Sequence, residues 1–386
     1  MNAAPPRHDR LTACRETARA EMKQDHTVKE GVVMSVRPLR LPQDLIPAAE
    51  MLVKTFQYPD HPEWGVQSDE QEQLVDSIRR IRRIWPILRL FQLVSPGLRD
   101  LIRGFAWEES GGLCGLTIGQ REGTTSMWYI GTVGVLPEWR GRGVARRLLV
   151  ATLDMMRAKG GTRVRLGVID GNTPAQALYR SLGFVEYGGA TRYALTPSTT
   201  VDRSPLPAGY EELPLAEFDW RTRFELDKRI VPADLQEFEP IVPGRYKAPA
   251  VIRVLAPIFR FVETTRDHDV VVRRAADRVI VARAGWSVSK KGKGTNQIRV
   301  RLDPAHGDLA FYLARRALGE VLAQSPSLRV ETFLPAWMPD AAREVESLGF
   351  VRRTSHKSMG MKLQLLVSEP RGVERTGCRA GRIPLP

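Results

Sequence analysis

The sequence predicts an α+β protein built from two similar units, and three observations support this fold class. The chain has 386 residues, which is more than one domain of about 100–200 residues needs. Strand-like and helix-like segments alternate through both halves. The run RVRLGVIDGNTPAQALYRSLGFV at 163–185 has a counterpart, RVETFLPAWMPDAAREVESLGFV, at 329–351. The shared Ser-Leu-Gly-Phe and the matching order of the surrounding elements indicate a duplication.

Periodicity and turn-forming residues predict the elements of the first unit. We expect Pro86 and Pro96 to interrupt the apolar segment that follows the helix beginning at Ser68. The expected strands are 35–40, 103–109, 112–121, 127–136, 163–169 and 184–195, and the expected helices are 44–56, one from Ser68, one carrying Leu148, Leu149, Leu153 and Met156 on one face, and 172–182.

Composition sets the boundaries of the two units. Residues 1–33 are polar without sustained periodicity, and we expect a disordered leader there. The first unit is then 34–196, and a linker rich in Pro, Ser and Thr occupies 197–209. The second unit is 210–366, followed by a tail at 367–386 that we expect to be disordered.

Composition also narrows the classes of function. No apolar run is long enough to span a membrane, and the first residues lack the apolar core of a secretion signal. The cytoplasm is therefore the expected compartment. Cys14, Cys114 and Cys378 are scattered, so we expect neither a disulfide framework nor a metal site. The net charge of +14 attracts polyanions in general, but no common nucleic-acid-binding motif occurs, and no nucleic-acid partner is expected.

The stretch EWRGRGVARRLL at 138–149 has the composition of an anion-binding loop. It places Gly141 and Gly143 directly before an amphipathic helix, whose first amides have no partner within the helix. Glycine lets the backbone curl with its N–H groups inward, and Arg140, Arg142 and Arg146 add positive charge. The helix dipole favours an anion at the same place. The stretch therefore predicts a phosphate site, with a plain strand-to-helix turn as the alternative.

The surrounding segments resemble a known family. A strand through Val133, this loop, a helix and a second strand lead to Asn172-x-x-Ala175-x-x-Leu178-Tyr179-x-x-x-Gly183-Phe184. Over residues of about 35–195 the chain resembles the GCN5-related N-acetyltransferase (GNAT) superfamily. The resemblance implies a tandem arrangement, in which each unit is a mostly antiparallel twisted sheet flanked by helices and the second unit is a degenerate copy.

The resemblance also implies acetyl-CoA as the acyl donor, with transfer of its acetyl group to an amine acceptor. It places the pyrophosphate of CoA on the glycine loop, the pantetheine arm along the strand through Val133, and Tyr179 next to the thioester sulfur. The implied CoA contacts are Val133, Gly134, Val135, Arg140, Gly141, Arg142, Gly143, Val144, Ala145 and Asn172.

Tyr179 fits the role of general acid. A tyrosine with its usual pKa near 10 stays protonated at neutral pH and can donate to a thiolate whose conjugate acid has a pKa near 8.5. The general base is not identified. The strand leading into the loop has no carboxylate, and the alternatives are Glu108 or Glu109, a group in the loop with Asp60, His61 and Glu63, or a chain of water molecules.

The second unit lacks the residues that the family match requires. Gly307-Asp308-Leu309-Ala310-Phe311-Tyr312 stands opposite the glycine loop, Met338 opposite Asn172, and Val345 opposite Tyr179. An acid and two aromatic side chains are unsuited to a loop that must approach an anion closely. We expect the second unit to be catalytically silent.

Two other functions compete with the enzyme. A CoA-binding or scaffolding protein would need the loop but not Tyr179. An interfacial membrane helix is suggested by 77–105, where arginines alternate with large apolar residues, but we expect this segment to pack against the sheet or to form the wall of a pocket. The acceptor is not identified, and a homodimer is compatible with the sequence.

Overall fold

The computed structural model describes residues 35–57, 64, 68–94, 99–109, 111–196, 201, 204–217, 219–248, 250, 253, 256, 264–290 and 292–364. The predicted leader and tail lie outside these residues. The strands are β1 (Ser35–Pro38), β2 (Arg103–Glu109), β3 (Gly112–Arg121), β4 (Met127–Val135), β5 (Arg163–Ile169), β6 (Val185–Leu195), β7 (Tyr210–Pro214), β8 (Thr265–Arg274), β9 (Ile280–Ser289), β10 (Asn296–Leu302), β11 (Val330–Pro335) and β12 (Val351–Lys362). The helices are α2 (Leu45–Thr55), α3 (Ser68–Val94), α5 (Val144–Ala158), α6 (Thr173–Ser181), α7 (Trp220–Ile230), α8 (Pro243–Tyr246), α10 (Leu309–Gln324) and α11 (Pro339–Ser347).

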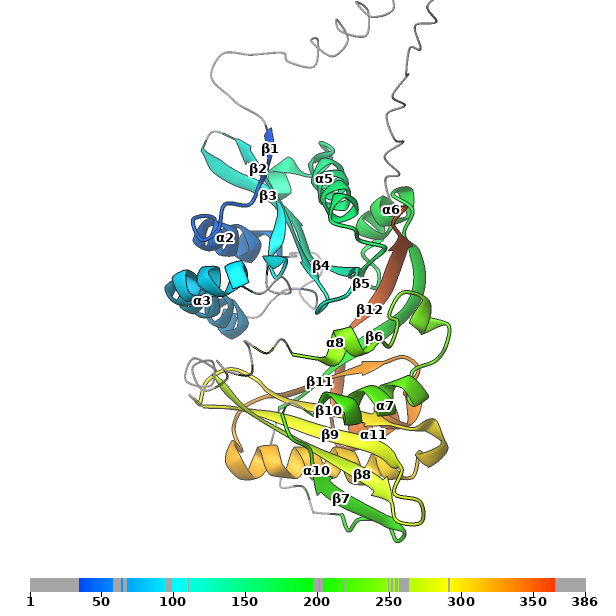
Figure 1. The fold of residues 1–386 in the computed structure, drawn as a ribbon. Helices are drawn as coiled ribbons and strands as arrows, with labels where there is room; N and C mark the ends of the chain where they lie inside the picture. The colour runs from blue at the N-terminus through cyan, green and yellow to red at the C-terminus, as the bar shows by residue number, and fades with distance from the viewer. Residues whose placement is uncertain are drawn as a thin grey trace, which may run out of the picture.

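The described strands form one continuous sheet in the order β1-β2-β3-β4-β5-β12-β6-β11-β10-β9-β8-β7. The two halves of the chain therefore exchange their last strands. β12, the last strand of the second half, pairs antiparallel with β5, and β6 of the first half pairs antiparallel with β11. β6 and β12 also pair with each other, so they join the sheets of the two halves in the middle of the molecule (Figure 1).

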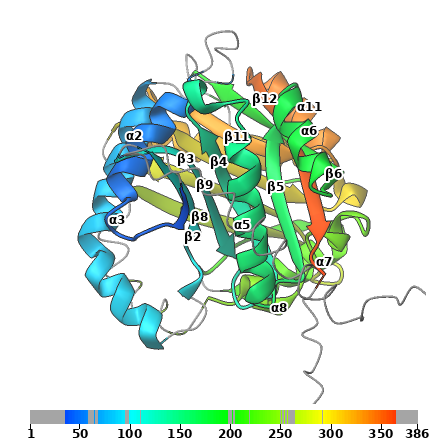
Figure 2. The ribbon, with the colours of Figure 1, turned by 90° about the horizontal axis from the view of Figure 1, so that it is seen from above.

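Helices cover the sheet on both faces. In the first half, α2 packs its Met51 and Leu52 on Leu116 of β3, while α5 packs on the opposite face and joins Thr152 to Thr117 by a 2.5 Å hydrogen bond between their hydroxyls. Figure 2 shows α2 and α3 on one side of these strands and α5 and α6 on the other. In the second half, α10 buries Leu313 and Leu318 against β9 and β10.

The α+β class and the element order agree with the sequence predictions, and most boundaries differ by one or two residues. The interruption expected at Pro86 is wrong, because α3 continues through that residue to Val94. The strand exchange was not anticipated, and it means that the sheet does not divide between residues 196 and 210. Within the described residues, no helix combines the length and the apolar character needed to cross a membrane.

Candidate active site

A gap opens between β4 and β5 near the middle of the first half. The two strands pair in parallel from Met127–Arg163 to Ile130–Leu166 and then diverge. Between β3 and β4, Ile118 faces Thr132 and Gly119 faces Ile130, so Gly131 is bulged out of the ladder at the start of the gap. The β5-facing edge of residues 131–135 thus runs along an opening instead of along a neighbouring strand.

The glycine loop lies between β4 and α5. A short 3₁₀ turn at Pro137–Trp139 follows β4, and the chain then passes through Gly141 and Gly143 with φ values of +74° and +76°. Such values are accessible to glycine at little cost. The Arg147 N–H donates to Gly143 O at 3.1 Å, so the helical hydrogen bonds begin there, and the amides of 143–146 precede them. A Cβ atom at either glycine would meet open space, so the glycines serve the backbone conformation of the loop.

The arginines of the loop divide into two kinds. The guanidinium of Arg140 donates to Val135 O at 3.2 Å and to Thr55 O at 2.9 Å. It therefore ties the loop to the ends of β4 and α2. Arg142 is exposed and lies over the Trp139 ring at 4.6 Å, and Arg146 donates to Ser181 Oγ at 2.8 Å. Arg142 and Arg146 remain the predicted sources of positive charge beside an anion.

α6 positions Asn172 and Tyr179. Asn172 is the N-cap of α6, and its side-chain oxygen accepts from the Ala175 N–H at 3.2 Å, which leaves its amide nitrogen to serve as a donor. Tyr179 is 7% exposed and makes an edge contact with Phe184, with ring centroids 6.0 Å apart. It belongs to the same core cluster as Ile130 and Leu166, the last paired residues before the gap.

A cleft of about 700 Å³ lies on the opposite face of these strands. Because successive side chains of a strand point to opposite faces, the lining residues Tyr129, Arg165 and Gly167 face away from the cluster that holds Tyr179. The gap between β4 and β5 therefore connects the face of the sheet that carries Tyr179 with the face that lines the cleft. β6 of the first half also lines the cleft, and the second half contributes to the wall from α7, the segment up to α8, β10, β11 and β12.

An ion network crosses this cleft wall from one half to the other. Arg165 contacts Glu122 at 2.6 Å and Glu239 at 3.5 Å, and Arg245 contacts the same two carboxylates at 3.1 and 3.3 Å. The Tyr187 hydroxyl donates to Glu239 at 2.7 Å. Burial alone would raise the pKa of Glu239, but Arg165, Tyr187 and Arg245 hold that pKa below its usual value. Glu239 is therefore ionised at neutral pH. No sequence motif marks this network, because its members lie far apart in the chain.

Of the predicted candidates for the general base, Glu108 and Glu109 lie on β2, which β3 and β4 separate from the gap. Glu108 is paired with Arg37 at the edge strand, and Asp60, His61 and Glu63 lie outside the described residues. The structure instead places His356 of β12 in the cleft, against the Phe333 ring. Burial, followed by the charge of Arg192, lowers the pKa of His356. The imidazole is thus neutral at pH 7 and able to accept a proton.

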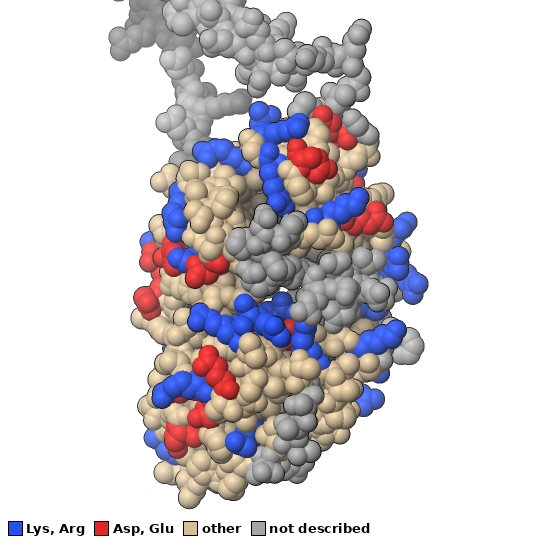
Figure 3. Space-filling view, turned by 180° about the vertical axis from the view of Figure 1, so that it is seen from behind, with Lys and Arg blue, Asp and Glu red and all other residues tan. Residues whose placement is uncertain are grey.

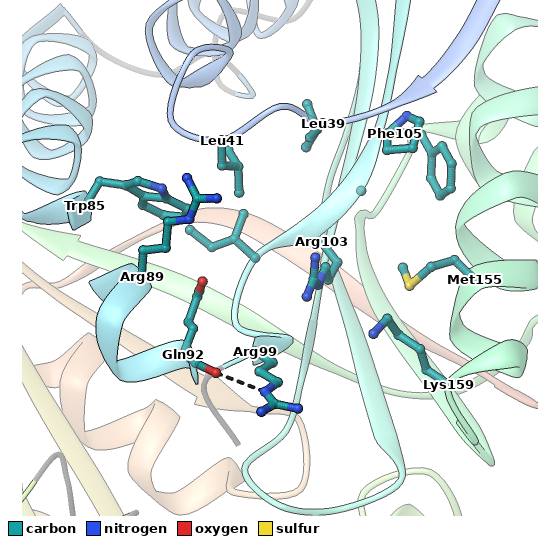
Figure 4. A pocket seen from close by; sticks show the side chains of 13 residues that line it. Leu39, Leu41, Trp85, Arg89, Gln92, Arg99, Arg103, Phe105, Met155 and Lys159 are labelled. Carbon is teal, nitrogen blue, oxygen red and sulfur yellow. Dashed lines mark hydrogen bonds between the residues drawn. The ribbon is translucent and has the colours of Figure 1, made fainter. Parts of the chain in front are cut away.

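A second cavity of about 350 Å³ lies between α3, β2 and the end of α5 (Figure 4). It combines apolar side chains such as Leu39 and Phe105 with basic ones such as Arg103 and Lys159. Trp85 of α3 is buried against it, in agreement with the expectation that 77–105 forms the wall of a pocket. On the outside of the same helix, Ile87, Leu90 and Leu93 are exposed.

The second half has the same elements without the loop geometry. Its 3₁₀ turn at Pro304–His306 is separated from α10 by Gly307 and Asp308 alone, whereas four residues separate the corresponding turn from α5. Asp308 has a helical φ of −57° and places a carboxylate at the helix start. In the described part of the chain, no group of three or more His, Cys, Asp or Glu side chains is arranged to hold a metal ion.

Comparison with known proteins identifies a family match in the first half and several relatives of the chain. Residues 72–184 match the model of the acetyltransferase (GNAT) family. A stretch of 153 residues, 40% of this chain, is 29% identical to mycothiol acetyltransferase of Renibacterium salmoninarum and covers 41% of that protein. A stretch of 91 residues, 20% of this chain, is 41% identical to N-alpha-acetyltransferase RimI of Mycobacterium tuberculosis and covers 56% of it. The chain thus matches about half the length of these relatives.

The fold of both halves has a counterpart among solved structures. A tandem GNAT protein from the clavulanic acid biosynthesis pathway superposes with a TM-score of 0.56, covering 86% of this chain and 99% of that one, at 15% identity. Likeness at this identity establishes the fold. It extends the GNAT likeness beyond residues 72–184 to the second half.

Proposed function

This chain is a member of the GNAT superfamily with two GNAT-like domains, and from that premise we propose that its first half is an acetyl-CoA-dependent N-acetyltransferase. The observation that carries the proposal is the opening of the β4–β5 gap beside the glycine loop that begins α5. An extended pantetheine arm fits such a gap as an added strand. A pyrophosphate fits the amides at the start of α5.

In this proposal the loop residues Arg140 to Ala145 form the pyrophosphate cradle, and the edge of β4 at Val133, Gly134 and Val135 binds the pantetheine arm. Asn172 donates its amide N–H to the same arm, because its oxygen is engaged in capping α6. Each amide-to-phosphate hydrogen bond contributes about 1.5–3 kcal/mol.

The acetyl group then reaches the gap from the α5 side, and the amine approaches from the cleft side. The amine nitrogen attacks the thioester carbon, and the bond from carbon to sulfur breaks. Tyr179 donates its proton to the departing thiolate. The backbone N–H groups beside the bulge at Gly131 are suited to stabilise the oxyanion. The neutral His356 is a candidate to receive the proton that the amine loses.

A CoA-binding protein without catalysis is the second candidate. It is favoured by the absence of a carboxylate at the gap among the described residues of β4 and β5. The two functions differ in what they require of Tyr179, since binding alone has no use for a proton donor near the sulfur.

Calorimetric titration with acetyl-CoA tests the proposed cradle. We expect micromolar binding at one site per chain, and a loss of at least roughly hundredfold in affinity in Gly143→Glu, which places a carboxylate where the phosphate would bind. Gly160→Glu is the matched control, since Gly160 ends the same helix with a φ of +72° and equally open surroundings. Both variants carry the same backbone strain and charge. Equal loss in both, or no binding by the folded wild type, would contradict the proposal.

A further inference from the structure

A third cavity, of about 230 Å³, lies in the second half between β9, β10, β11 and β6. Its charged lining is unbalanced, since it combines four arginines with one carboxylate, Glu331. The lining residues are Arg192, Arg283, Gln297, Ile298, Arg299, Arg301, Glu331, Thr332 and Phe333. Basic side chains also form a band across the middle of the molecule on the face shown in Figure 3.

Two of these arginines face each other directly. Arg283 of β9 and Arg301 of β10 are cross-strand partners in the antiparallel ladder, where opposed side chains lie closest and like charges destabilise the pair. Both side chains are half-buried. Arg301 donates to Val300 O at 3.1 Å and lies 3.9 Å from Met338 Sδ. Among the described residues, neither Arg283 nor Arg301 has a carboxylate within ion-pair distance.

The other charged groups of the cavity are already engaged. Glu331 is shared by Arg192 at 2.7 Å and Arg329 at 3.0 Å. Arg299 donates to Ser287 Oγ at 2.5 Å and lies 3.9 Å from Asp269. The next carboxylate along the cleft, Asp227, accepts the Tyr246 hydroxyl at 2.8 Å. None of these groups therefore forms an ion pair with Arg283 or Arg301, and Asp269 and Asp227 compensate their positive charge only from a distance.

Two opposed arginines without an ion-pair partner destabilise the sheet. Burial lowers the pKa of both guanidiniums. Asp269, followed by Asp227, opposes this effect at Arg283, and Asp227 opposes it at Arg301, in each case without forming an ion pair. An apolar residue of similar length at either position would remove the repulsion. An oxyanion would neutralise the pair and accept its N–H groups in the forked geometry that guanidiniums favour.

We propose that Arg283 and Arg301 bind an oxyanion, a carboxylate or a phosphate, in this cavity. The site opens toward the gap in the first half, because Arg301 and Phe333 line both this cavity and the central cleft. This inference rests on the proposed acetyltransferase function. It predicts that the acceptor is an amine that also carries an acidic group. The amine lies at the gap, and the acidic group lies between β9 and β10 of the other half.

Thermal unfolding at constant ionic strength tests the site without any acceptor. We titrate inorganic phosphate, and in a separate series glutarate, against chloride, and expect a saturable rise in the unfolding temperature of the wild type. The anion that reaches half of its maximal effect at the lower concentration shows whether the site prefers a phosphate or a carboxylate. Arg283→Met and Arg301→Met are expected to raise the unfolding temperature without anion, because the repulsion is removed, and to weaken anion binding roughly tenfold to hundredfold.

Arg266→Met is the matched control, since it removes the same charge from an exposed position on the neighbouring β8. It should leave the anion effect unchanged. If the wild type shows no saturable effect of either anion, or if Arg266→Met weakens it as much as Arg283→Met does, the inference is wrong and only an unspecific ionic effect remains.

Rates of acetyl transfer to two amines, one with and one without an acidic group, test the oxyanion site separately from the proposed acetyltransferase function. Acceptors such as 6-aminohexanoate and its amide differ only in the acidic group, and CoA release reports turnover. We expect Arg283→Met to raise KM for the acid at least tenfold and to leave kcat and acetyl-CoA affinity unchanged. Acetyl-CoA binding without an anion effect refutes the oxyanion site alone. An anion effect without acetyl-CoA binding refutes the acetyltransferase alone.

Discussion

The starts of α5 and α10 differ more than any other corresponding parts of the two halves. Before α5, the connection has four residues, and its two positive-φ glycines have open space where a Cβ atom would lie. Before α10, two residues make the same connection, with a helical φ at Asp308 and a carboxylate at the helix end. The helices themselves pack alike on their strands. A difference of two residues and of two positive-φ glycines thus separates the loop proposed to hold a phosphate from its counterpart in the second half.

The helices α6 and α11 also differ in their polar groups. Asn172 caps α6 with its side chain, whereas Met338 begins α11 without a side-chain cap. Tyr179 on α6 corresponds to Val345, which is fully buried. The second half has kept the packing residues of the fold and not the polar groups of the first half. What it contributes instead lies on the cleft face, in the strand β12 and in the arginines of β9 and β10.

Separating the halves is expected to have the largest effect. A chain ending at residue 203 lacks β12, which pairs with both β5 and β6, and it leaves the β11-facing edge of β6 open. We expect neither this fragment nor one beginning at residue 204 to show cooperative thermal unfolding alone. Coexpression of the two should restore it. A first half that unfolds cooperatively and binds acetyl-CoA alone would show that the exchange is dispensable.

Removing one hydroxyl from each half is expected to have the next largest effect. Tyr179→Phe keeps the edge contact with Phe184 and should lower kcat by about 10²–10⁴ with acetyl-CoA affinity unchanged. In the second half, the Tyr312 hydroxyl of α10 donates to Glu212 of β7 at 2.5 Å. Tyr312→Phe removes this hydroxyl and should lower the free energy of unfolding by about 1 kcal/mol without affecting kcat. Rates and calorimetry on both variants distinguish these effects. Equal kcat for Tyr179→Phe and the wild type would show that Tyr179 is not the general acid, whereas acetyl-CoA binding without any turnover by the wild type would favour the binding protein over the enzyme.

Local sequence was sufficient for most elements of the first half and for the loop, although not for the continuation of α3 through Pro86. The strands at 103–109, 112–121 and 163–169 have the predicted bounds, because alternation and turn residues are local signals. Gly143 takes the left-handed conformation before α5, at a position where the sequence predicted that glycine is needed. The binding and catalytic roles of the site residues stay predictions until acetyl-CoA binding and turnover are measured.

Pairings between distant segments could not be predicted in the same way. Both last strands follow Ser-Leu-Gly-Phe, so no local signal tells β6 from β12 or its own half from the other. The opposition of Arg283 and Arg301 depends on the register between β9 and β10, where a shift of one residue would move either side chain to the other face. Contacts between Arg165 and Glu239 likewise depend on how the segment before α8 lies on β5.

Replacing Glu239 tests how far the second half supports the cleft of the first. Glu239 is 29% exposed and accepts from Arg165, Arg245 and Tyr187. Glu239→Gln should lower the free energy of unfolding at pH 7 by about 2 kcal/mol, because two guanidiniums lose a charged partner. Glu237→Gln, which breaks an exposed pair with Lys362, should cost about 0–1 kcal/mol.

The pH dependence identifies the cause of that loss. The folded-state pKa of Glu239 is lowered from its ordinary value of 4.5, so its stabilising contribution is fully present above about pH 4.5 and is lost as the pH falls through the folded-state pKa. The difference between wild type and Glu239→Gln should therefore be constant from about pH 6 to 8 and shrink at lower pH, as measured by urea unfolding. A difference that persists unchanged at the lowest pH where the protein folds would mean that Glu239 acts through packing, and that the halves are not coupled by its charge.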